Sequence, residues 1–179
     1  PLPRAIYQKV LPNLKLVRLK RGTILKKQGH SDQVSRYLCK GFIGLYSPIE
    51  EVPTLFSIFK PSDTAFDLVS YGLGVPSDNE LKAISDVTFL EFTQESEKHL
   101  LSADLNLLQL AHKISLRVMA RQARSLEISK MGIQLGYSVL MQEYPGLEGE
   151  LTNSDLGGFF RVTKRTAERF KHNLKELGK

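Results

Sequence analysis

The sequence predicts an α+β fold in which an antiparallel β-structure is followed by helices, and a change of pattern near residue 95 is the main reason. Before this point, short apolar and β-branched runs alternate with Gly, Pro, Asp and Ser roughly every ten residues, which is typical of an antiparallel barrel or sandwich. After it, apolar residues recur at helical spacing. A basic amphipathic segment covers residues 151–179.

Each strand of the N-terminal half is expected where an apolar run is bounded by turn residues such as Arg21-Gly22 or Pro61. The expected strands cover residues 14–19, 23–26, 34–38, 42–46, 54–59, 81–84 and 87–92. The third and fourth of these are joined through Cys39-Lys40-Gly41 and are expected to form a hairpin. The last two are expected to pair with each other around Ser85-Asp86.

The first long helix is expected from about Ala103 to Leu126, a length of roughly 35 Å at 1.5 Å per residue. A small β-domain does not fully cover a helix of this length, so its apolar seam predicts pairing with the same helix of a second copy. The alternative is packing on the chain's own β-structure. The seam residues are spaced four, three and four positions apart: Leu107, Ala111, Ile114 and Val118. A second helix is expected over Lys130 to Tyr144, before Pro145-Gly146.

The C-terminal segment begins with a clear helix start. Thr152 is an expected N-cap, and Asp155, three residues later, stands where the acid of a capping box belongs. The helix is expected over Asn153 to Phe160. Its Gly157-Gly158 pair lowers helix propensity and therefore indicates the close approach of another backbone.

A tight turn at Arg161-Val162 leads into a last helix, which Thr163 is expected to cap and which extends to Leu174. Four apolar side chains are expected to point inward: Val162, Ala167, Phe170 and Leu174. Hydroxyl and basic side chains are left on the outside: Thr163, Lys164, Arg165, Thr166, Arg169 and Lys171. The recognition helix of a helix-turn-helix needs this arrangement, with apolar positions for docking and polar ones for base edges and phosphates.

The charge distribution favours a polyanionic partner. The net charge is +6, and residues 151–179 hold seven Lys or Arg against three acids. We therefore expect double-stranded DNA as the partner, with Arg165 and Arg169 reading bases. Lys164, Lys171 and Thr163 are expected on the DNA backbone. The alternative is an ordinary amphipathic helical hairpin with a solvated basic face.

Other classes of function find little support. The single cysteine, Cys39, excludes a disulfide or a thiolate cluster within one chain. The sequence has no nucleophile elbow, P-loop or His-Glu-x-x-His motif, so neither an enzyme, a cofactor nor a metal is expected. Lone histidines such as His30, His99 and His112 are more often surface or core residues than ligands. No apolar run is long enough to span a bilayer and no signal peptide opens the chain, so a cytoplasmic protein without a membrane partner is expected.

Two stretches carry a resemblance to a known family. Residues 22–32, followed by Tyr37-Leu38-Cys39-Lys40-Gly41, place turn glycines around a pair of strands. Residues 151–169 follow with Lys164, Arg165 and Arg169 on positions that usually contact DNA. With the long helix between them, these stretches resemble the Crp–Fnr family of bacterial regulators, and the resemblance covers nearly the whole chain.

The resemblance implies a cyclic-nucleotide-binding-like β-roll of the jelly-roll (double-stranded β-helix) type over residues 1–100. It implies a dimerisation helix and hinge over 101–128 and a winged helix-turn-helix with an incomplete wing over 129–179. A homodimer would then place two recognition helices about 34 Å apart on a near-palindromic DNA site. RNA polymerase and a small-molecule effector are further implied partners, with the effector acting through a hinge near Ser125–Lys130.

The chain departs from the family where the ligand would bind. Cyclic-nucleotide binders carry a Gly-Glu pair for the ribose, which Phe66 and Asp67 replace here, and an Arg for the cyclic phosphate. Ser77 stands in place of that Arg, with Asp78 beside it, so a buried phosphate would lack its bidentate partner. We expect an effector other than cAMP or cGMP, or none. Arg161 also occupies a turn position where glycine is common. The alternative function is a degenerate sensor or interaction module that does not regulate DNA.

Overall fold

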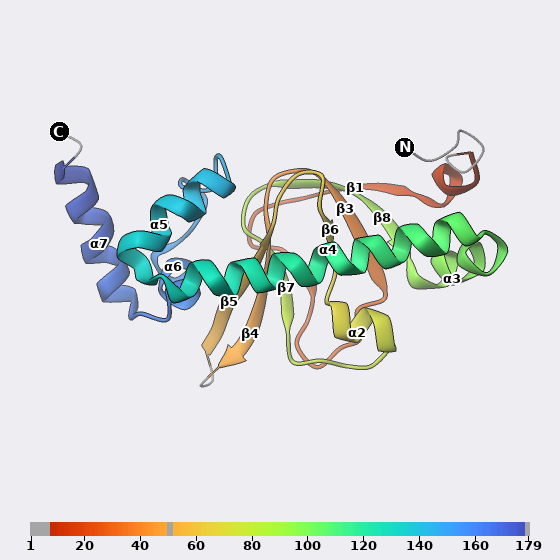
Figure 1. Cartoon of the computed structure of the whole chain (residues 1–179), viewed down its shortest axis with the longest axis horizontal. Coiled ribbons are helices and arrows are strands. Elements are labelled where there is room, and N and C mark those ends of the chain that lie inside the picture. The colour runs from red at the N-terminus through yellow and green to blue at the C-terminus, as the bar shows by residue number, and fades with distance from the viewer. Residues whose placement is uncertain (1–7, 50–51, 178–179) are drawn as a thin grey trace.

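The computed structural model describes residues 8–49 and 52–177, and in this part of the chain a β-roll is followed by a short helix, a long helix and three further helices (Figure 1). The β-roll consists of two four-stranded antiparallel sheets, with the strand orders β1-β8-β3-β6 and β2-β7-β4-β5. Its strands are β1 Lys15–Leu19, β2 Ile24–Lys26, β3 Val34–Lys40, β4 Ile43–Ile49, β5 Val52–Phe59, β6 Thr64–Ala65, β7 Glu80–Ala83 and β8 Val87–Thr93. The predicted α+β class and its antiparallel N-terminal half are confirmed.

Two of the predicted strand pairings are wrong. β3 pairs with β6 and β8, whereas β4 pairs with β5 and β7, so the expected β3–β4 hairpin is a corner between the two sheets. The connection of β7 to β8 at Ser85-Asp86 is also a corner. The two corners meet, since a Cβ on Gly41 would lie 2.2 Å from the carbonyl oxygen of Asp86. Gly41, with φ of 84°, is therefore required both for the turn and for the contact.

Several elements were not predicted from the sequence, among them the two-residue strand β6. A 3₁₀ turn, η1, covers Leu11–Asn13, and a six-residue helix, α2, covers Leu68–Leu73 and ends at Gly74 in the left-handed region. The expected long helix is confirmed as α4 (Leu105–Lys130), and a separate helix that was not predicted, α3 (Gln94–Ala103), precedes it. Asp104 lies between them in extended conformation and caps α4, because its carboxylate accepts from the amide of Asn106 at 3.0 Å.

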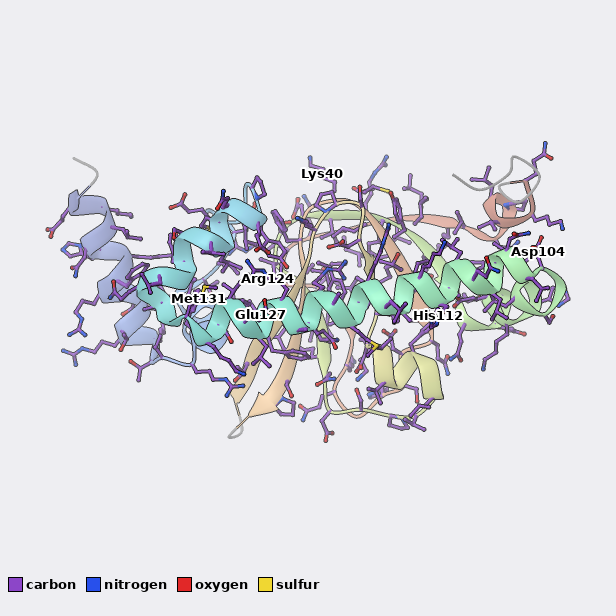
Figure 2. All side chains as sticks on the ribbon, in the orientation of Figure 1. Lys40, Asp104, His112, Arg124, Glu127 and Met131 are labelled. Atoms are coloured by element: carbon purple, nitrogen blue, oxygen red, sulfur yellow. The ribbon has the colours of Figure 1, made fainter. Side chains whose placement is uncertain are left out.

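Helix α4 runs along the length of the molecule, with α3 near one end and the C-terminal helices near the other (Figure 1). The C-terminal helices are α5 (Gly132–Glu143), α6 (Asn153–Phe160) and α7 (Lys164–Leu177). Figure 2 marks the course of α4 by Asp104 at its start, His112 in its first third and Met131 at its end. In the described part of the chain, α7 is the last element.

The buried side chains of the described residues form two hydrophobic cores. One fills the β-roll and includes Leu45, Phe59 and Phe89 together with Val118 of α4. The other joins the β4–β5 hairpin to the C-terminal helices, from Leu55 to Phe159. A Cβ on Gly158 would lie 3.1 Å from the amide nitrogen of Leu55, so this glycine lets α6 lie directly on β5.

The expected dimer seam is used inside the protomer. Leu107 and Val118 are only 5% and 1% exposed in the single chain, and Ile114 packs on the β-roll core. Ala111, the fourth residue of that seam, is half-buried on the same side of the helix. Two residues of the face that was expected to meet a second copy, Ile114 and Val118, therefore pack on the chain's own β-roll, which was the alternative.

Candidate nucleic-acid interface and effector site

Helix α6 begins with the predicted capping box. The hydroxyl of Thr152 accepts from the amide of Asp155 at 3.0 Å, and the Asp155 carboxylate accepts from the amide of Thr152 at 3.0 Å. These two bonds satisfy amides that have no partner within the helix. The same carboxylate group accepts a hydrogen bond from the hydroxyl of Tyr46 at 2.9 Å, which ties the start of α6 to β4.

The turn between α6 and α7 is tight and has one backbone position in an unusual conformation. Arg161 has φ of 54° and ψ of 44°, the left-handed region that glycine adopts more easily. The amide of Val162 donates to the carbonyl of Gly157 at 2.9 Å, and a Cβ on Gly157 would lie 2.8 Å from the Val162 oxygen. Gly157 is therefore the small residue that the crossing of the two helices requires.

Helix α7 is capped as predicted and docks through one face. The hydroxyl of Thr163 accepts from the amide of Thr166 at 3.1 Å and shares a 2.9 Å hydrogen bond with the Thr166 hydroxyl. Ala167 and Phe170 are buried, and Phe170 makes an edge-to-face contact with Tyr137 of α5 at 5.2 Å between ring centroids. Leu174 was expected to point inward, but it is 37% exposed because the docking surface ends near Phe170.

The outer face of α7 carries cations without partners. Arg165 and Arg169 are exposed and make no hydrogen bond or ion pair to another described residue. They lie one helical turn apart, and His172 continues the same face one turn further. Lys164 is exposed and stands 3.9 Å from Glu168, a separation at which an exposed pair is weak. Figure 1 places α7 at one end of the molecule, away from the β-roll.

Lys171 does not belong to this outer face, contrary to the prediction. Its side chain is half-buried, and its ammonium group donates to the carbonyl oxygen of Leu151 at 3.0 Å. Burial lowers the pKa of Lys171 below its ordinary value. Lys171 follows the buried Phe170 and points toward the loop that precedes α6. Its hydrogen bond to Leu151 connects α7 to this loop.

The residues at the expected effector position are packed against a lysine that the sequence did not single out. Phe66 and Asp67 are 4% and 1% exposed, Ser77 is half-buried and Asp78 is exposed. The ammonium group of Lys26 donates to the carbonyl and hydroxyl oxygens of Ser77 at 2.8 and 2.6 Å. It also lies 3.4 Å from the Asp67 carboxylate, and both side chains are only 2% exposed.

A second buried ion pair supports the first. The guanidinium group of Arg36 donates to Asp32 at 3.1 Å, and the Asp32 carboxylate accepts from the amide of Asp67 at 2.9 Å. Each buried charge thus has an opposite charge and further hydrogen bonds, as burial requires. We call Lys26, Asp32, Arg36, Asp67 and Ser77 the buried polar cluster. These residues do not line either of the cavities of about 540 and 670 Å³.

The architecture is shared with Crp/Fnr-family regulators and with cyclic-nucleotide-binding domains. No family model matches the chain, and no curated protein matches it either. A Crp/Fnr-family regulator from Eubacterium rectale superimposes with a TM-score of 0.76 at 14% identity, over 99% of this chain and 85% of that chain. The c-di-GMP-responsive global regulator CLP of Xanthomonas campestris gives 0.71 at 12% identity, over 98% of this chain and 93% of that one.

The cAMP-bound regulatory domain of Toxoplasma gondii PKA matches a smaller part. It gives a TM-score of 0.50 at 13% identity over 55% of this chain, and the matched part is 37% of that chain. At these identities the similarities show a common fold. None of the helices in residues 8–49 and 52–177 is long and apolar enough to cross a membrane.

Proposed function

We propose that the chain is a DNA-binding transcription regulator of the Crp–Fnr type, in which α6 and α7 form the helix-turn-helix. The observation that carries this proposal is the two-sided character of α7. Ala167 and Phe170 dock one side, and Arg165 and Arg169 leave the other side cationic and without partners. A helix that is held in place and presents free guanidinium groups fits the major groove of DNA.

Each remaining residue of the interface has a proposed role. Arg165 and Arg169 reach base edges, where a guanidinium group can make two hydrogen bonds to guanine. Thr163 and Lys164 lie at the N-terminal end of α7, where the helix dipole and free amides favour a phosphate. Thr166 supports Thr163 through their shared hydrogen bond and lies at the edge of the contact. Lys171 is not assigned a DNA contact, because its ammonium group already donates a hydrogen bond to the carbonyl oxygen of Leu151.

We propose a homodimer that forms through a face of α4 different from the predicted one. Large apolar side chains are exposed along one line of this helix: Leu105, Leu108, Leu116, Met119 and Leu126. His112 and Ala123 complete this line, the exposed stripe, with spacings of three and four residues. Beside its C-terminal part lies a hollow of about 540 Å³ between α4, β5 and α6. A second copy of α4 fits such a stripe because the heptad spacing is complementary to itself.

The proposed division of the chain is a sensor domain over 1–100, a dimerisation helix and hinge over 101–128, and a DNA-binding domain over 129–179. The buried polar cluster supports an effector other than cAMP or cGMP, or none. Its Asp67 carboxylate already neutralises the Lys26 ammonium group, so the cluster leaves no free cation for a phosphate.

DNA binding is tested by fluorescence anisotropy with random-sequence duplex DNA at low and physiological salt. We expect affinity to fall steeply with salt, because contacts between cations and phosphates release counterions. The R165A/R169A double variant should bind this DNA more weakly and lower the salt slope by about two, because two cations that lie close to the phosphates are lost. Lys27→Ala removes an exposed cation of the β-roll and is the matched control. Weak binding that is independent of salt would instead support the interaction module.

The dimer is tested by sedimentation equilibrium. Leu116→Glu places a charge in the middle of the exposed stripe and should give monomers, because a carboxylate in an apolar interface is desolvated without a partner. Leu135→Glu, at a 71% exposed position of α5, is the control and should leave the dimer intact. A dimer that persists in the Leu116→Glu protein would contradict this interface.

A further inference from the structure

A cavity of about 670 Å³ lies between α4, α3 and the sheet that contains β3, β6 and β8. Its volume is within the range of small-molecule sites. It is separate from the buried polar cluster, none of whose residues lines it, and from the outer face of α7. It also lies on the side of α4 that faces the β-roll, away from the exposed stripe, so a second copy on that stripe would leave it open.

The lining of this cavity is polarised along α4. At one end, where β6 approaches the helix, it is polar and includes Ser62, Asp63 and Arg117. At the other end, where α3 and the N-terminal segment meet α4, the lining is apolar: Leu11, Leu14, Leu100, Leu101, Leu107 and Leu110. A ligand that fits both ends has a polar head and an apolar tail.

The charges at the polar end favour an anionic head. Lys113, Arg117 and Arg121 follow each other at intervals of four residues and all line the cavity. Arg121 forms an ion pair with Asp63, but its Nη1 atom is buried without a hydrogen-bond partner in the described residues. Lys113 and Arg117 are exposed and make no hydrogen bond or ion pair to a described residue. The row therefore holds more positive charge than Asp63 neutralises.

Glu97, the other acid in the lining, repels an anionic ligand only weakly. Glu97 of α3 is half-buried, and its carboxylate accepts a hydrogen bond from the hydroxyl of Tyr71. Burial raises the pKa of Glu97 above its usual value, and the Tyr71 hydrogen bond offsets part of this rise. This shift makes Glu97 easier to protonate than a solvated carboxyl.

We propose that this cavity binds an amphipathic carboxylate with a linear hydrocarbon tail. The carboxylate pairs with the guanidinium group of Arg117, with the ammonium group of Lys113 one helical turn away, and the tail extends along α4 toward Leu107. From Arg117 to Leu107 the helix rises about 15 Å, which suits a tail of roughly ten to twelve carbons. This proposal goes beyond the proposed function and does not depend on DNA binding.

Isothermal titration calorimetry of the full chain with dodecanoate, below its micellar concentration, tests the proposal. We expect saturable one-to-one binding with a negative heat-capacity change, since apolar surface is buried. Dodecanol, which has the same tail without the charge, should bind about tenfold more weakly, and Arg117→Gln should weaken dodecanoate binding by a similar factor. Lys130→Gln, which removes an exposed cation of α4 outside the cavity, should leave binding unchanged.

A second variant tests the apolar end without relying on charge. Leu110→Trp fills the middle of the cavity and should abolish dodecanoate binding, whereas Leu135→Trp on the exposed surface of α5 should not. Circular dichroism spectra of both variants are compared with wild type to check that they are folded. No saturable binding to the wild-type chain would overturn the proposal. Equal binding of dodecanol and dodecanoate, or of the Arg117→Gln and wild-type proteins, would overturn the role assigned to the cations. DNA affinity is measured separately, so failure here leaves the proposed regulator untouched.

Discussion

The β-roll and helix α7 use basic side chains in opposite ways. In the roll, the side chains of Lys26 and Arg36 are 2% and 6% exposed, and each is paired with a fixed carboxylate. On α7, Arg165 and Arg169 are exposed and have no partner among the described residues. A buried charge must be neutralised inside the protein because its desolvation is costly. A cation that is to contact a phosphate or a base edge must be left unpaired, since an internal partner would compete with the ligand.

Removal of a basic side chain should therefore lower the stability of the protein in the roll and lower DNA affinity on α7. The largest expected effect is the loss of stability in the roll. Lys26→Met leaves the Asp67 carboxylate buried without its counter-ion and should lower the free energy of unfolding by about 3–5 kcal/mol. Urea denaturation followed by circular dichroism measures this change. DNA affinity per folded molecule should stay the same.

Two further variants make the result specific to the buried pair. Lys27→Met changes the neighbouring exposed lysine and should alter stability by less than about 0.5 kcal/mol. The K26M/D67L double variant removes both charges and should recover much of the loss, because no unpaired charge remains. If the double variant were as unstable as Lys26→Met, the lost stability would come from packing and not from the unpaired carboxylate.

On α7 the effect should fall on binding instead. Arg169→Ala should reduce the affinity for a selected operator by about 1–3 kcal/mol and relax the preference for one base pair. The free energy of unfolding should change by less than about 0.5 kcal/mol, because the side chain is exposed and unpaired. Selection of binding sites from a random library, with wild type and variant side by side, measures the preference. An unchanged site preference would remove Arg169 from the base-reading role.

A smaller effect is expected at the turn that holds α7 in place. Arg161 is held in the left-handed region, which costs a residue with a side chain on the order of 1 kcal/mol relative to glycine. Arg161→Gly should therefore raise the free energy of unfolding by about 1 kcal/mol. Arg161→Ala keeps the strained backbone conformation and should not raise the free energy of unfolding. This control distinguishes relief of backbone strain from the effect of removing the guanidinium group. Thermal unfolding of the three proteins provides the comparison.

The sequence was sufficient for local features and insufficient for long-range ones. Thr152, Asp155 and Thr163 could be recognised as caps because each accepts from an amide three residues away. Lys26 could not be recognised as a buried cation, since its partner Asp67 is 41 residues distant and nothing in the alternation of β2 marks it. The corner between β3 and β4 also depends on a distant residue, Asp86.

Helix α4 shows why periodicity alone did not identify the surface available to a partner. Leu107 and Val118 define one apolar line, and Leu116 and Met119 belong to another, with the same helical period. Only the position of the β-roll decides which line is buried, and that position depends on contacts between distant parts of the chain. Lys171 was misplaced for a related reason, because the carbonyl of Leu151 that it binds lies 20 residues away.

The smallest expected effect concerns Glu97 of α3, an acid that has no cation partner within the described residues. Burial raises the pKa of Glu97 above 4.5, so the folded state disfavours its ionised form. Below pH 4.5 the group is protonated in both states and has no effect on stability; as the pH rises above 4.5, ionisation increasingly favours the unfolded chain. Glu97→Gln should therefore stabilise the protein at pH 7, and the gain should disappear toward pH 4.

The control for this variant is Glu95→Gln, because Glu95 lies exposed in the same turn of α3. It should give no gain at either pH, since a solvated carboxylate has nothing to recover by becoming neutral. Urea denaturation at pH 4 and pH 7 compares both variants with wild type. A gain of equal size at the two pH values would show that Glu97 acts through shape or hydrogen bonding. A gain confined to pH 7 would show that the half-buried Glu97 carboxyl, which has no counter-ion among the described residues, resists ionisation in the folded state, whereas the Lys26 charge is neutralised by Asp67.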